Sequence, residues 1–161
     1  MKHSIAKTKA PALVLAILMA VLLLTGCTKT PATTSDFLTV AENKGYLSND
    51  VMSQFSGYSD TVKEATVAAP ASIAFKLEFY VLADETKAKD FFETNRQTLE
   101  ANKTGVYSSS SVNGKNYQSF SLTAGGQYMF IERVGTTVLF VSPTDSANKD
   151  EIEAFIKELG Y

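Results

Sequence analysis

Residues 111–140 read SVNGKNYQSFSLTAGGQYMFIERVGTTVLF. Asn113-Gly114, Gly125-Gly126 and Gly135 interrupt this stretch at regular intervals. Two-residue hairpin turns favour Asn-Gly and Gly-Gly because their central residues take positive φ angles. The segments between these turns carry β-branched and aromatic residues, which are typical of strands. The stretch therefore predicts an antiparallel meander with strands at about 105–112, 115–124, 127–134 and 136–142.

The turn at Gly125-Gly126 also predicts the register of the hairpin. A two-residue turn places Leu122 opposite Met129 and Phe120 opposite Ile131. Val138 and Phe140 then share their face, whereas Ser119, Ser121, Thr123, Tyr128 and Phe130 lie on the other face. Apolar side chains on both faces indicate either that both faces are covered or that one face is a docking surface.

The rest of the chain supplies helices and further strands. The alternation from Ile73 to Leu82 predicts a strand, and residues 61–69 predict a second one. Residues 47–60 are rich in turn formers and predict a loop with one short strand. Apolar spacing predicts three helices: residues 35–46 ending at Gly45, a helix from the cap Asp84 to about Asn102, and a last helix with a capping box of Asn148 and Glu151.

These elements predict an α+β fold: an antiparallel sheet of about five to six strands with helices packed on it. The order is helix, strand or strands, helix, four-strand meander, helix. From residue 73 onward, this order resembles the TATA-binding-protein-like fold and, more loosely, the PsbP-like sandwiches. The resemblance concerns architecture, and architecture carries no function.

The N-terminal segment has the features of an export signal. Lys2, Lys7 and Lys9 precede an apolar run at residues 13–24, which as a helix rises about 18 Å. A bilayer core is about 30 Å thick, so the run is short for a permanent span. It ends in Leu24-Thr25-Gly26-Cys27, which resembles the lipobox of bacterial lipoproteins. The alternatives are a signal peptide with an incidental cysteine and a short signal anchor.

The resemblance to bacterial lipoproteins implies a division of the chain. Residues 1–26 would be a cleaved signal peptide, and Cys27 would carry a diacylglyceryl group that holds the protein to membrane lipid. Residues 27–36 would be the lipidated cysteine with a flexible tether, and residues 37–161 a single globular domain. The protein would be extracytoplasmic, anchored to the cell membrane or, in a host that has one, to the outer membrane.

Composition excludes several chemistries. Without residues 1–26, the formal net charge falls from −2 to −5, which disfavours binding to nucleic acid. The only histidine, His3, and the only cysteine, Cys27, lie in the first 27 residues. The remaining chain therefore lacks the residues of Ser-His-Asp or Cys-His catalysis and of histidine or cysteine metal sites. We expect no cofactor, no metal and no catalytic residue.

A few side chains outside these classes suggest sites. Ser108–Ser111 suggests a nucleophile, but without histidine a polar edge strand is the favoured interpretation. Asp145, Asn148, Asp150 and Glu151 suggest calcium, but helix capping explains every one of them and is the favoured interpretation. The predicted binding residues are Tyr117, Tyr128, Phe130 and Arg133 on the meander, although core packing is the default interpretation of the aromatics and a cross-strand or surface pair that of Arg133.

The sequence thus favours a non-catalytic module that binds a small ligand or an envelope protein. One alternative is a carboxylate-dependent envelope hydrolase, whose paired acids cannot be found from spacing alone. The other is an accessory or assembly subunit of a membrane complex.

Overall fold

The computed structural model describes residues 28–161. The predicted signal peptide and Cys27 lie outside these residues. The elements in chain order are α2 (Thr34–Asn43), β1 (Leu47–Asp50), the 3-10 helix η1 (Met52–Tyr58), β2 (Val62–Ala69), β3 (Leu77–Leu82), α3 (Glu85–Glu100), β4 (Tyr107–Asn113), β5 (Tyr117–Ala124), β6 (Gln127–Val134), β7 (Thr137–Asp145), the 3-10 turn η2 (Ser146–Asn148) and α4 (Lys149–Leu159).

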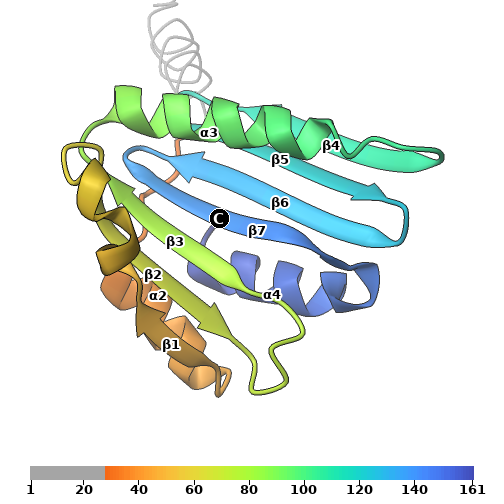
Figure 1. Ribbon diagram of the computed structural model, residues 1–161, viewed down its shortest axis with the longest axis horizontal. Helices are drawn as coiled ribbons and strands as arrows, with labels where there is room; N and C mark the ends of the chain where they lie inside the picture. Colours follow the sequence, from red (N-terminus) through yellow and green to blue (C-terminus); the bar gives the residue numbers. More distant parts are fainter. Residues whose placement is uncertain (1–27) are drawn as a thin grey trace, which may run out of the picture.

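The strands form one antiparallel sheet in the order β1-β2-β3-β7-β6-β5-β4 (Figure 1). The α+β class is as predicted, but the sheet has seven strands rather than five to six. The order in the sheet also differs from the order along the chain. After β3, the chain crosses through α3 to the far edge, and the last four strands return until β7 lies beside β3.

The predicted hairpin register is confirmed. Phe120 pairs with Ile131 and Leu122 pairs with Met129 across β5 and β6. Gly125 and Gly126 have φ angles of 57° and 78°, as a turn with two left-handed residues requires. A one-residue slip would have exchanged the two faces of the whole hairpin.

Helices cover both faces of the sheet (Figure 1). On one face, α3 packs its buried Ala88, Phe92 and Leu99 against a cluster that includes Phe120 and Ile131. On the other face, α2 and α4 pack against a second cluster, which contains Phe37, Phe79, Tyr128, Phe130, Leu139 and Phe155. Both faces of the meander are therefore covered, which was one of the two predicted alternatives.

Two local predictions are wrong. The strand expected from Ile73 begins only at Leu77, because residues 70–73 form a turn in which the Ile73 amide donates to Pro70. The capping box of α4 is absent, since the Asn148 side chain makes no cap hydrogen bond. Asp145 instead caps η2 by accepting from the Ala147 amide at 2.8 Å, and Glu151 accepts from the Tyr46 hydroxyl at 2.6 Å.

The segment expected to be a flexible tether is packed onto the domain. Lys29 and Asn116 exchange two hydrogen bonds between the Lys29 backbone and the Asn116 amide, at 3.0 and 2.7 Å. Ala32 is buried, and α2 already begins at Thr34 under the capping box of Thr33 and Asp36. The folded unit therefore starts near Lys29 rather than at residue 37.

A buried ion pair strengthens this attachment. The Lys29 ammonium lies 2.5 Å from a carboxylate oxygen of Glu132, whose side chain is 4% exposed. The same ammonium stands 5.1 Å above the centre of the Tyr117 ring. Burial raises the pKa of the Glu132 carboxyl, and the contact with Lys29 opposes that rise. Glu132 therefore depends on Lys29 to remain charged.

We expect Lys29→Ala to lower the free energy of unfolding by about 2 kcal/mol at pH 7 in a chemical denaturation. Removing one partner of a fully buried pair costs about 3–5 kcal/mol; Lys29 keeps 30% of its side-chain surface in solvent, so its loss costs less. Lys115→Ala, a change in the neighbouring exposed turn, is the control and leaves stability unchanged.

The loss of stability caused by Lys29→Ala depends on pH. The folded pKa of Glu132 lies above its unfolded value, so stability falls as the pH rises through the folded pKa. Without Lys29 this fall extends to higher pH. The difference between wild type and variant is therefore small where Glu132 is protonated and grows toward neutral pH. A difference that is constant with pH would contradict the role of this pair.

Candidate functional site

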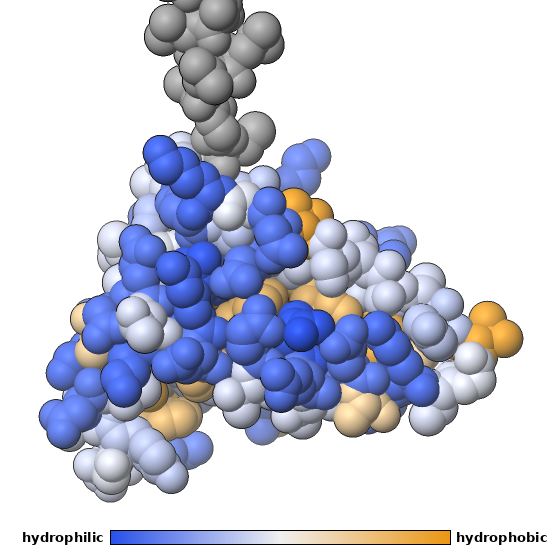
Figure 2. Space-filling model, turned by 90° about the horizontal axis from the view of Figure 1, so that it is seen from above, coloured by the Kyte–Doolittle hydropathy of each residue, from blue (hydrophilic) through white to orange (hydrophobic). Residues whose placement is uncertain are grey.

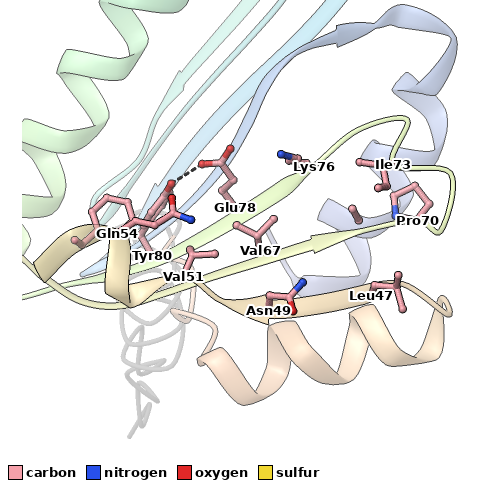
Figure 3. Close-up of a pocket in the computed structure, with 12 residues that line it drawn as sticks. Leu47, Asn49, Val51, Gln54, Val67, Pro70, Ile73, Lys76, Glu78 and Tyr80 are labelled. Atoms are coloured by element: carbon pink, nitrogen blue, oxygen red, sulfur yellow. Dashed lines mark hydrogen bonds between the residues drawn. The ribbon is translucent and has the colours of Figure 1, made fainter.

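The helix α3 leaves one part of its face of the sheet open. It packs against β3, β5, β6 and β7, and the side chains that β1, β2 and β3 present on this face border a groove. Figure 3 shows these side chains rising from the three strands, with η1 at one end and the loop before β3 at the other. This groove is the candidate site.

The register of the strands builds the floor of the groove. Asn49, Val67 and Glu78 form one row across β1, β2 and β3. Leu47 and Ala69 form the next row, and Lys76 precedes Glu78 by two residues along the chain. The remaining walls are Val51, Gln54 and Phe55 from the η1 region, and Pro70 and Ile73 from the loop. The groove encloses about 350 Å³.

A second hollow of about 390 Å³ lies between η1 and α3. Phe55 borders both hollows. Its ring meets that of Tyr80 edge-on, with 5.6 Å between centroids, and Tyr80 in turn lies 4.9 Å from Phe91 of α3. The row of rings Phe55, Tyr80 and Phe91 therefore separates the two hollows and supplies apolar surface to each.

Hydrogen bonds fix two of the polar side chains of the groove, Glu78 and Tyr80. The Glu78 carboxylate accepts hydrogen bonds from the Tyr80 hydroxyl and, at 3.2 Å, from the Ser142 hydroxyl. Burial raises the pKa of Tyr80, and the neighbouring charge of Glu78 raises it further, so the phenol stays protonated and donates. Lys76 is exposed at the groove and forms no ion pair with a described carboxylate.

This arrangement is suited to binding an amphipathic molecule. Ligand sites commonly enclose about 300–1,000 Å³ and combine apolar walls with a few placed polar groups. Among the described residues that line the groove, Glu78 is the only acid, so residues 28–161 do not place there the pair of carboxylates that glycoside hydrolysis uses. Among residues 28–161, no group of three or more histidine, cysteine or acidic side chains is placed to hold a metal ion.

The binding residues predicted from the sequence lie elsewhere. Tyr128 and Phe130 are buried beneath α4 in the core, and Arg133 is buried on the opposite face. Arg133 donates to Gln118, its cross-strand neighbour, at 3.0 Å and to the Gly135 carbonyl at 2.9 Å. Burial lowers the pKa of Arg133. Only Tyr117 remains partly exposed, beneath Lys29, so these four residues do not form an exposed docking surface.

The other sequence candidates have structural explanations. Ser108–Ser111 lie on β4, an exposed edge strand, which agrees with the favoured interpretation. Asp145 caps η2.

The groove could not be predicted from the sequence, because its residues come from separate segments that have only weak secondary-structure patterns. Leu47 to Tyr58 were expected to be mainly loop, and the structure folds them as β1 and η1. The one available signal was Tyr80, an aromatic residue on the strand face that also carries Lys76 and Glu78. Comparison with protein-family models, curated proteins and solved structures gives no match for this chain.

We expect Phe130→Ala to destabilise the domain by about 3–5 kcal/mol, as the removal of a buried aromatic ring does, because Phe130 is 7% exposed. Tyr58→Ala is the control. Its ring is 66% exposed, so the loss stays below about 0.5 kcal/mol. Thermal or chemical unfolding of both variants measures this. A small loss of stability for Phe130→Ala would indicate that Phe130 is a surface residue.

Proposed function

We propose that this protein is an extracytoplasmic, lipid-anchored binding module that takes a ligand into the groove over β1, β2 and β3. The anchor is proposed from the lipobox-like Leu24-Thr25-Gly26-Cys27. Among the described residues, none of the helices has the length and apolarity to span a bilayer. The observation that carries the binding role is the groove itself, an open apolar hollow beside an exposed lysine.

The lining supports an elongated amphipathic ligand with an anionic group. Leu47, Val67 and Phe55 offer apolar surface, and three exposed large hydrophobic residues, Leu47, Tyr58 and Ile73, stand at the two hollows. Lys76 is the one cation among the described residues that line the main groove. An anionic group beside Lys76 would pair with it, while the apolar body would displace water from the strands.

The attachment of Lys29 to the domain would restrict how the anchored protein lies at the membrane. Only one residue separates Lys29 from Cys27, and Lys29 is held by Asn116 and Glu132. A lipidated Cys27 would therefore keep the domain next to the membrane in a restricted orientation. The groove borders β1, at the opposite edge of the sheet from β4 and the β4–β5 turn that holds Lys29.

We expect an anionic, apolar dye, 8-anilinonaphthalene-1-sulfonate, to bind the groove with enhanced fluorescence. Lys76→Gln should weaken binding about threefold to tenfold, because one charge contact at a partly exposed site contributes about 1 kcal/mol. Val67→Glu should abolish binding by placing a charge on the floor. Lys115→Gln changes the charge equally, far from the groove, and is the control. Equal affinities of the Lys76 and Lys115 variants for the dye would contradict the proposed binding site.

The anchor has a separate test. Mass spectrometry of protein extracted from the native membrane should show Cys27 as the first residue, carrying a diacylglyceryl group. Cys27→Ala should leave an uncleaved precursor or release the protein from the membrane fraction. An unmodified Cys27 within an unprocessed chain would refute the anchor and leave the dye experiment unaffected.

A further inference from the structure

Three of the exposed large hydrophobic residues lie together at one edge of the sheet, whereas Leu38 lies on α2 and the others line the two hollows. Val106, Tyr107 and Val112 are 96%, 50% and 45% exposed. They lie in or beside β4, whose seven residues are all exposed. Figure 2 looks down on the molecule from above and shows blue, hydrophilic surface alongside a paler region that carries separate orange patches.

β4 is an edge strand without the usual protection against pairing. It pairs with β5 over seven consecutive residues without a bulge, and it contains neither a charge nor a proline. The opposite edge, β1, has only four residues and ends in Asp50. Edge strands normally carry charges, prolines or bulges because their free backbone groups are a template for another strand.

The sequence of β4 matches its own copy in one antiparallel register. The backbone groups that point outward from a strand belong to alternate residues, so two identical strands pair only about an axis that passes through a residue. An axis at Ser109 places Val106 opposite Val112 of the second copy and Ser108 opposite Ser110. β4 itself contains no charged residue, and the two flanking lysines, Lys103 and Lys115 of the second copy, fall opposite each other outside the strand. Each valine pair would bury apolar surface that is exposed in the single chain.

We propose that β4 pairs with β4 of a second copy of this chain about a two-fold axis at Ser109, which joins the two sheets into one continuous sheet. The occupant of this edge is therefore the protein itself. The interface is small for a stable dimer in solution, and confinement of two anchored copies to one membrane raises their effective concentration.

The attachment of the N-terminal segment is compatible with this pairing. Glu132 pairs with Leu139, which belongs to the cluster beneath α2 and α4, so Lys29 lies on that face. The two-fold axis of an antiparallel edge pair is perpendicular to the sheet. Both copies therefore present Lys29 on the same side, and both anchors can enter one membrane. The shared membrane and the confinement of the two copies rest on the proposed lipid anchor.

Cysteine cross-linking in membranes of cells that express the full chain tests the register. Ser109→Cys should give mostly disulfide-linked dimer under mild oxidation, because residues opposite each other have Cβ atoms about 4.5–5.5 Å apart. Ser111→Cys lies on the same strand and face, but it stands opposite Tyr107 of the second copy. The two Ser111 positions are therefore about 13 Å apart along the strands, at about 3.3 Å per residue. It should cross-link at least tenfold more slowly, and Ser48→Cys on β1 should not cross-link above background.

The wild type under the same oxidant reports on Cys27 separately. A cross-linked wild type would show a free Cys27 thiol, which contradicts the anchor and not the edge pairing. A second variant avoids cysteine chemistry: Ser109→Lys places like charges across the axis and should weaken dimerisation at least tenfold, measured as energy transfer between fluorescently tagged copies in the same membranes. Equal cross-linking of Ser109→Cys and Ser111→Cys, or unchanged energy transfer for Ser109→Lys, would overturn the proposal.

Discussion

The antiparallel pairing of β3 with β7 is the contact on which the rest of the structure depends. Four residue pairs, from Glu78 with Phe140 to Val81 with Thr137, join β1–β3 to β4–β7. Without this junction, the chain would be two small sheets, each with one poorly covered face. Because β7 closes against β3, α3 must cross the sheet to reach β4, and it covers one face as it does so. The opposite face is left for α2 and α4, and each face acquires its own core.

The same junction explains why the groove exists. α3 runs roughly along the strands rather than across them (Figure 1), and a helix is about 10–12 Å wide, which is less than the width of a seven-stranded sheet at about 4.8 Å per strand. Its contacts lie with β3 and β5–β7. The side chains of β1 and β2 on this face are left to η1, which covers them only in part. The two hollows meet where η1 places Phe55 against Tyr80.

Local periodicity could predict the parts of the fold that depend on neighbours in sequence. Phe120, Leu122, Met129 and Ile131 alternate around a Gly-Gly turn, so their register and common face follow from the turn. Phe37, Val40 and Ala41 follow the helical repeat and are buried as expected. Lys29 shows where such reasoning fails. The sequence TKTPATTS has the composition of a linker, and its attachment to Asn116 and Glu132 involves partners more than eighty residues away.

Some properties of the candidate site also follow from the sequence alone, and others depend on the tertiary structure. The absence of histidine and cysteine after residue 27 is a property of composition, and it excludes whole classes of catalysis whatever the fold. The lipobox-like segment and the strand-forming pattern of the meander are likewise legible in the sequence, because both depend on adjacent residues. Which apolar side chains are core and which line a groove was decided by tertiary structure alone. Tyr128 and Tyr80 look alike in the sequence, yet one lies under α4 and the other borders the hollow beside Phe55. Burial depends on which helix reaches which strand, and that depends on long-range strand pairing rather than on local pattern.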